Sequence, residues 1–278
     1  MIKSVLLTLA LLAASPALAQ TAPVDQGRPI IIGRSLTLDS RVLGETRRIN
    51  VHLPASYDKA PARTYPVLYL LDGGEQEDFP HIAGLAQLGE LSWTFREMIV
   101  VGIEGTDRRR DMTHPTTVAK ERSDFPTSGG SAAYRQFLGE ELKPWINARY
   151  RTSGETALIG ESLAGLFVVE TFLKQPALFD AYIAASPSLW WDDQSLARGA
   201  AADLALWPAG ERKLYLTIAD EGSTMQAGVD RVVSALKQAP PTGLTWRYDP
   251  MPRLQHSTIY HPAALEAFKT VWPGPRPD

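Results

Sequence analysis

The chain has 278 residues, of which 44% are hydrophobic and 21% charged, and its formal net charge is −3. These values are those of an ordinary globular protein and exclude a disordered, collagen-like or coiled-coil chain. The small negative charge argues against a nucleic acid as partner. The sequence contains no cysteine, which excludes disulfides, thiol nucleophiles and thiolate metal ligands. The length suits a single α/β domain.

Residues 1–19 have the pattern of a cleavable secretory signal peptide. Lys3 precedes an apolar run, and Ala17 and Ala19 form the small-residue cleavage site that follows it. The run is too short to cross a bilayer about 30 Å thick, which disfavours a membrane anchor. We therefore expect cleavage after Ala19, a periplasmic or secreted protein with no membrane attachment after cleavage, and one domain over residues 20–278.

Apolar stretches along the rest of the chain predict strands and helices in alternation. Ile49 and Val51 alternate with polar residues, which predicts a half-buried strand at residues 47–53. Later segments are continuously apolar, as in strands buried on both faces of a parallel sheet: residues 66–71, 98–103, 156–159, 181–184 and 213–218. Apolar residues three and four apart predict helices around residues 134–146, 229–236 and 265–272. This alternation indicates a doubly wound α/β domain, in which chemistry occurs at the carboxyl ends of the strands.

Ser162 has the setting of a nucleophile elbow. It lies between Gly160 and Ala164, directly after the buried strand at residues 156–159 and before an apolar, helix-like run. A tight turn between strand and helix needs small residues two positions before and after the serine, and it exposes the hydroxyl above the sheet. Glycine is usual at the position of Ala164, which adds one methyl group. The alternative is a serine that only caps the helix.

The order serine, acid, histidine found in elbow enzymes restricts the base to two of the 5 histidines, His256 and His261. His261 precedes Pro262 where the last helix is expected to begin, so a capping or surface role fits it. We favour His256, which lies in a loop after a predicted strand at residues 244–248. An imidazole there can take and return a proton near neutral pH.

The acid is expected after the buried strand at residues 213–218, where Asp220 and Glu221 stand. Either carboxylate could hold the imidazole in the right tautomer and stabilise it once protonated, and the spacing does not choose between them. Asp192 and Asp193 are a weaker alternative. A solvated loop carboxylate is the interpretation that assigns no catalytic role.

Backbone N–H groups are expected to bind the oxyanion. One belongs to Leu163, directly after the nucleophile, and the other to Gly74 or Glu75, in the loop after the strand at residues 66–71. Glycine in that loop lets the backbone approach a substrate closely. An ordinary turn at the end of a strand would have the same sequence.

Several segments together resemble the putative esterase family of α/β-hydrolases, over about residues 30–272. The segments that carry the resemblance are residues 68–73, residues 101–103 followed by 108–113, residues 137–144 and the Ser-Pro-Ser-Leu-Trp-Trp segment at 186–191. The chain is most similar to the siderophore (ferric enterobactin) esterase branch, in its size and its pair of tryptophans. The resemblance implies the α/β-hydrolase fold, with a mostly parallel central sheet of about eight strands flanked by helices.

The resemblance also implies a role for each of the candidate catalytic residues. Ser162 would be the nucleophile and His256 the base. Because relatives have an acid in the segment at residues 221–222, the resemblance favours Glu221 and keeps Asp220 in reserve.

Arginines and tryptophans that belong to these segments are candidates for substrate binding. Arg108 and Arg110 either hold their loop through ion pairs or bind anionic and catecholate oxygens through their planar guanidinium groups. Trp190 and Trp191 are expected to line an acyl or aromatic pocket, unless one of them belongs to the core.

The sequence therefore predicts an exported serine carboxylic-ester hydrolase that acts on a small-molecule ester through a catalytic triad and an acyl-enzyme. No metal ligand spacing and no cofactor motif is present, so neither a metal nor an organic cofactor is expected. Siderophore, feruloyl, acetyl-sugar and small xenobiotic esters all fit. An acyltransferase with the same triad is one alternative, and a non-catalytic ligand-binding module on the same fold is the other.

Overall fold

The computed structural model describes residues 27–275, so the predicted signal peptide lies outside the described residues. By its internal contacts the chain divides into a short N-terminal unit, Met1–Ile31, and a large unit that begins at Ile32. All the helices and strands below belong to the large unit. None of the helices within residues 27–275 is long and apolar enough to cross a membrane.

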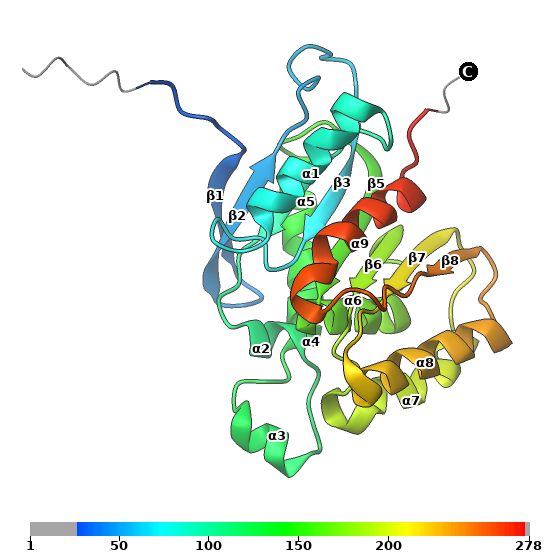
Figure 1. Cartoon of the computed structure of the whole chain (residues 1–278). Coiled ribbons are helices and arrows are strands. Elements are labelled where there is room, and N and C mark those ends of the chain that lie inside the picture. The colour runs from blue at the N-terminus through cyan, green and yellow to red at the C-terminus, as the bar shows by residue number, and fades with distance from the viewer. Residues whose placement is uncertain (1–26, 276–278) are drawn as a thin grey trace, which may run out of the picture. The chain divides into compact units, whose positions relative to one another are not determined.

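The large unit is built on an eight-stranded sheet with the order β1-β2-β4-β3-β5-β6-β7-β8 (Figure 1). β1 and β2 pair antiparallel, as do β2 and β4, and all the remaining neighbours pair parallel. The strands are β1 (Arg34–Ser40), β2 (Glu45–His52), β3 (Tyr65–Leu70), β4 (Ile99–Ile103), β5 (Thr152–Glu161), β6 (Ala181–Ala185), β7 (Arg212–Thr217) and β8 (Leu244–Tyr248). The prediction of a mostly parallel sheet of this size is confirmed.

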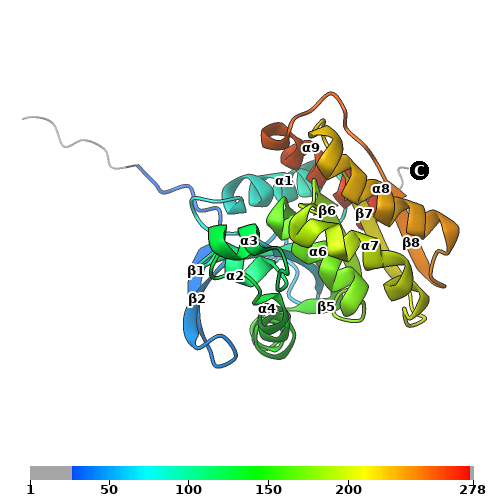
Figure 2. The same cartoon turned by 90° about the horizontal axis from the view of Figure 1, so that it is seen from below.

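Helices cover both faces of the sheet, which is why its central strands are continuously apolar. Along β3, Leu68 packs into one core and Tyr69 into the other, because successive side chains point to opposite faces. α1 (Phe79–Ser92) and α9 (His256–Val271) pack together on one face (Figures 1 and 2).

The other face is covered by α4 (Ser131–Phe137), the π-helix η1 (Leu138–Leu142), α5 (Lys143–Asn147), α6 (Leu163–Lys174), α7 (Trp191–Ala205) and α8 (Gly222–Gln238). The single helix predicted around residues 134–146 is thus three consecutive pieces, of which the middle one is the π-helix. Pro144 has no N–H to donate, so one α-helical hydrogen bond is missing at that point.

Two short helices lie in the loops at the carboxyl end of the sheet. α2 (Arg108–Met112) follows β4, and α3 (Ala119–Asp124) stands away from the sheet at this end of the unit (Figure 1). α3 has no buried residue. Since ligands of parallel sheets bind beyond the carboxyl ends of the strands, these loops are where a site is expected.

Candidate active site

Ser162 occupies a strained turn between β5 and α6. Its backbone angles are φ 60° and ψ −119°, a region that residues other than glycine adopt only at a cost of about 1–3 kcal/mol. A Cβ at Gly160 would lie 2.6 Å from the Cβ of Ala164. The methyl group of Ala164 therefore fills the space that Gly160 leaves open, which explains how alanine is accommodated where glycine is usual.

The backbone N–H of Leu163, next to Ser162, is available to bind a negatively charged oxygen. Leu163 is the first residue of α6, where a helix supplies no acceptor for the N–H group. The positive end of the helix dipole is at the same point, so this N–H favours negative charge nearby. The hydroxyl of Ser162 lies 3.3 Å from that of Ser188.

His256 is held by Glu221. The Nδ1 atom of His256 lies 2.6 Å from Oε2 of Glu221, whose side chain is only 5% exposed. An ionised carboxylate can only accept, so Nδ1 carries the proton and Nε2 is left as the acceptor. His256 is also the first residue of α9, whose start is fixed by a capping box between Gln255 and Thr258.

The other candidates for the acid and the base lie elsewhere. Asp220 is exposed. Asp192 accepts hydrogen bonds from Thr117, and its histidine neighbour is His114, at 4.0 Å. His261 packs beside His81, with 3.4 Å between their Nδ1 atoms. Burial and this neighbouring histidine lower the pKa of His261.

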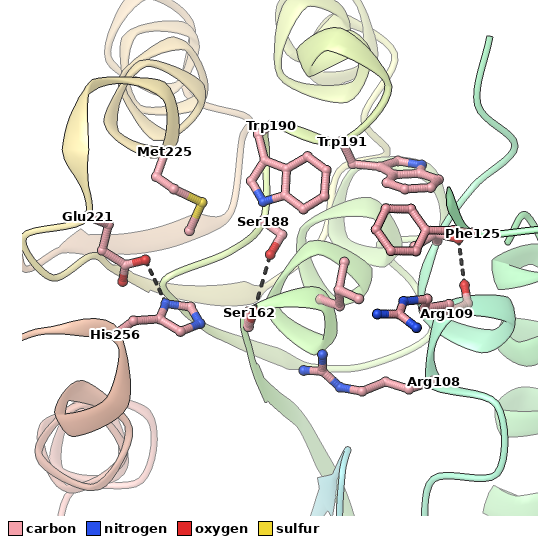
Figure 3. A pocket seen from close by; sticks show the side chains of 12 residues that line it. Arg108, Arg109, Phe125, Ser162, Ser188, Trp190, Trp191, Glu221, Met225 and His256 are labelled. Carbon is pink, nitrogen blue, oxygen red and sulfur yellow. Dashed lines mark hydrogen bonds and ion pairs between the residues drawn. The ribbon is translucent and has the colours of Figure 1, made fainter. Parts of the chain in front are cut away.

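Ser162 and His256 line the same cavity, which has a volume of about 360 Å³. Figure 3 shows Ser162 near its centre with the His256 imidazole on one side. Within residues 27–275 no direct hydrogen bond joins the two, and such bonds are often long until a substrate binds. The cavity is lined by Arg108, Arg109, Thr113, Phe125, Ser162, Leu163, Ser188, Trp190, Trp191, Glu221, Met225 and His256.

Both tryptophans reach the cavity, but in different ways. Trp190 is half-buried and forms part of the wall. Trp191 is 1% exposed and its indole N–H donates to the carbonyl of His114 at 2.8 Å. Trp191 therefore belongs to the core as well as to the cavity.

The three consecutive arginines differ in whether they line the cavity. Arg110 bonds Glu45 at 2.7 Å and Asp111 at 2.7 Å, and it does not line the cavity. Of the two interpretations of Arg110, these contacts support the one in which ion pairs hold its loop, and not substrate binding, because both of its acidic partners are supplied by the fold. Arg108 lines the cavity but is paired through Nε with both oxygens of Asp72 at 2.9 Å.

Arg109, the middle arginine of the cluster, is not among the residues predicted above to bind substrate. It lines the cavity and its guanidinium lies 4.5 Å from the ring centroid of Phe125. No pattern in the sequence separates Arg109 from its neighbours, because the choice depends on where the acids of β2 and the β3 loop end up.

The structure also corrects the expected oxyanion loop. The N–H of Gly74 donates to Oε2 of Glu77 at 2.7 Å, and the N–H of Gly105 donates to the same oxygen at 3.2 Å. Gly74 and Glu75 line a different cavity from the one that contains Ser162. The carboxylate of Glu77 thus takes the amide that was expected to face the substrate.

Two partly buried carboxyl groups lie next to the site. Burial raises the pKa of Asp72 to about 6, against the effect of Arg108. Burial, together with the charges of Asp78 and Glu221, raises the pKa of Glu161 to about 8. One oxygen of Glu161 is buried without a hydrogen-bond partner, which also favours the uncharged form of this carboxyl group. Residues 27–275 contain no group of three or more acidic or histidine side chains placed to hold a metal ion.

Comparison with known proteins places the chain in a family. The sequence model of the putative esterase family matches residues 40–234. The chain belongs to this family.

Several curated relatives of this chain are named as esterases of siderophores. It is 34% identical over 164 residues to the ferri-bacillibactin esterase BesA of Bacillus subtilis, a match that covers 53% of this chain and 56% of that protein. It is 32% identical over 155 residues to the apo-salmochelin esterase of Escherichia coli, covering 52% of this chain and 48% of that one. The chain thus spans about half the length of the curated relatives it matches.

Solved structures confirm the α/β-hydrolase fold. An IroE-like serine hydrolase from Shewanella oneidensis superposes with a TM-score of 0.80 at 28% identity, covering 86% of this chain and 80% of that one. The siderophore hydrolase EstB from Aspergillus nidulans superposes with a TM-score of 0.75 over 90% of this chain and 98% of that one, at 20% identity.

Proposed function

We propose that this protein hydrolyses carboxylic esters, with Ser162 as nucleophile, His256 as base and Glu221 as the acid that orients it. The observation that carries the proposal is the arrangement around one cavity. A strained serine elbow lies there opposite an imidazole whose Nδ1 is bound by a buried carboxylate at 2.6 Å. That bond leaves Nε2 free to accept a proton from within the cavity.

In the proposed reaction, Ser162 Oγ attacks the ester carbonyl while Nε2 of His256 takes its proton. Glu221 keeps the proton on Nδ1 and stabilises the imidazolium, as in other triads. The C–O bond to the alcohol then breaks, and His256 gives its proton to the leaving oxygen. Water attacks the acyl-enzyme in the same way, so that its proton passes through His256 to Ser162 and the acid is released.

The charge that develops on the carbonyl oxygen is bound by the N–H of Leu163 in this proposal. That donor is at the start of α6, so the helix dipole adds to the hydrogen bond. The N–H of Gly74 could join it only after Glu77 has released it.

We further propose a siderophore ester as substrate and an exported location. The first rests on the names of the relatives and on a cavity whose wall is aromatic and carries arginines. The second rests on residues 1–19, which lie outside the described residues. Amino-terminal sequencing of protein from the periplasm or medium is expected to begin at Gln20.

Labelling with a fluorophosphonate, followed by peptide mapping, tests the nucleophile. The label is expected on Ser162 and is expected to disappear in Ser162→Ala, together with hydrolysis of 4-nitrophenyl butyrate. Ser188→Ala is the matched control, because its hydroxyl lies only 3.3 Å away in the same cavity. A label on Ser188, or a folded protein that takes no label, would exclude the proposed mechanism.

Chromatography of reactions with enterobactin, apo-salmochelin and ferri-bacillibactin tests the substrate. Release of hydrolysed fragments by the wild type and not by Ser162→Ala is the expected result. Turnover of the nitrophenyl ester without cleavage of any of the three would exclude siderophore esters of these kinds and leave the esterase mechanism in place.

A further inference from the structure

Arg109, which lines the candidate active-site cavity, has no acidic partner among the residues that the structure describes. Its neighbours in sequence are both paired with acids, Arg108 with Asp72 at 2.9 Å and Arg110 with Glu45 at 2.7 Å. Within residues 27–275, none forms an ion pair or a hydrogen bond with the guanidinium of Arg109, although its backbone carbonyl accepts from the hydroxyl of Thr113 at 2.6 Å. The cavity's acid, Glu221, is engaged by His256. The field inside the cavity therefore favours an anion.

Arg109 is held in place by an aromatic ring instead of an acid. Its guanidinium lies 4.5 Å from the ring centroid of Phe125, a cation–π contact that leaves its N–H donors unused. Phe125 in turn packs against Trp191, with 5.8 Å between their ring centroids. The ring that contacts Arg109 is thus itself packed against Trp191, a residue of the core.

The segment that carries Phe125 is anchored although α3 itself buries nothing. Oδ1 of Asp192 accepts from the backbone N–H of Thr117 at 2.6 Å, and the backbone N–H of Asp192 donates to Glu121 at 3.0 Å. These bonds tie Thr117 and Glu121 to the start of α7. The backbone N–H of Phe125 donates to the carbonyl of Glu121 at 2.8 Å, so the ring under Arg109 is placed by the fold.

The position of Arg109 relative to the proposed base decides which part of an ester it meets. In Figure 3, Ser162 lies between His256 on one side and Arg109 with Phe125 on the other. The leaving alcohol must lie on the side of His256, because the imidazole gives it a proton. The acyl part then extends away from His256, toward Arg109.

We propose that Arg109, stacked on Phe125, binds an anionic group on the acyl part of the substrate and so selects esters with anionic acyl groups. This inference rests on the proposed function, because the direction of the acyl part follows from the role of His256. A guanidinium has planar donors that match a carboxylate or a pair of phenolate oxygens.

Two nitrophenyl esters with the same leaving group test the inference. One has a glutaric acyl chain that ends in a carboxylate, and the other has the corresponding carboxamide, which has the same shape without the charge. The wild type is expected to prefer the acid by roughly 10- to 100-fold in kcat/KM, the range of a charge-assisted hydrogen bond. The preference is expected mainly in KM and to fall with added salt.

Arg109→Gln is expected to bring the acid-to-amide ratio close to one. The ratio is measured on a single preparation, so a loss of folded enzyme cancels from it. Arg149→Gln is the matched control, because Arg149 also stacks on an aromatic ring, 4.1 Å from the centroid of Trp145. It lies before β5 instead of at the carboxyl end of the strand, and the wild-type ratio is expected to persist.

The outcomes separate this inference from the proposed function. If the wild type hydrolyses neither ester and takes no fluorophosphonate label, the proposed function fails. If it hydrolyses both equally, or if Arg109→Gln keeps the preference, only the role of Arg109 fails. A preference for 4-acetoxybenzoate over 4-acetoxybenzamide that is lost in Arg109→Gln would place the anion on the alcohol side and overturn the proposed orientation.

Discussion

Glu161, the residue before the proposed nucleophile, is expected to make the protein less stable as pH rises. Its pKa is raised from 4.5 to about 8 by burial and by the charges of Asp78 and Glu221. Between these values the unfolded chain has released the proton and the folded protein still holds it. The contribution of Glu161 to the free energy of unfolding is therefore fully present below about pH 4.5 and is lost as pH rises toward 8.

The size of the effect follows from the shift. At about 1.4 kcal/mol for each pKa unit, a fully buried group would contribute about 5 kcal/mol. Because Glu161 is only partly buried, solvent screening reduces this, and we expect ~2 kcal/mol. Glu161→Gln keeps the shape and cannot titrate, so its free energy of unfolding lacks this dependence on pH.

Thermal unfolding followed by circular dichroism at about pH 5 and about pH 9 measures the difference. The Tm of Glu161→Gln minus the Tm of the wild type is the quantity compared. This difference is expected to be larger by about 4–8 °C at the higher pH than at the lower pH. Glu211→Gln changes an exposed carboxylate and serves as the control, with no such rise. A difference in Tm between Glu161→Gln and the wild type that is the same at both values would refute the reasoning.

Other substitutions test the site and its support. Glu221→Gln is expected to lower kcat for nitrophenyl butyrate by roughly 10³- to 10⁴-fold, whereas Asp220→Asn, which changes an exposed side chain, should stay within a few-fold. Asp111→Asn removes the carboxylate that lies 2.6 Å from the buried guanidinium of Arg47, while Glu45 still pairs with that guanidinium at 2.9 Å, so urea unfolding should show a loss of about 1–3 kcal/mol. Gly160→Ala forces a methyl group to 2.6 Å from that of Ala164, and a loss of about 1–3 kcal/mol is expected in the same assay. An unchanged urea midpoint in either variant would contradict the packing described.

The fold could be predicted because its signals are local. β3, β4 and β6 are buried along their whole length, and each is a continuous apolar run in the sequence. The elbow is also local, since Gly160 and Ala164 are each two residues from Ser162. Such features need no knowledge of which distant segments meet.

What could not be predicted depends on distant partners. Whether Arg108, Arg109 or Arg110 faces a ligand is decided by acids that come from β2 and from the loop after β3. The turn after β7 decides that Glu221 and not its neighbour reaches the imidazole. The engagement of Gly74 depends on the side-chain conformation of Glu77, which a sequence pattern does not specify.

The placement of His256 at the first position of α9 has a consequence for biosynthesis. α9 is the last helix of the described chain, and it packs against α1, which is made much earlier. The proposed base therefore reaches the serine only when the carboxyl-terminal helix docks onto the sheet. A nascent chain that already contains the elbow but lacks α9 would have no proposed base, so the onset of ester cleavage would report the docking of α9.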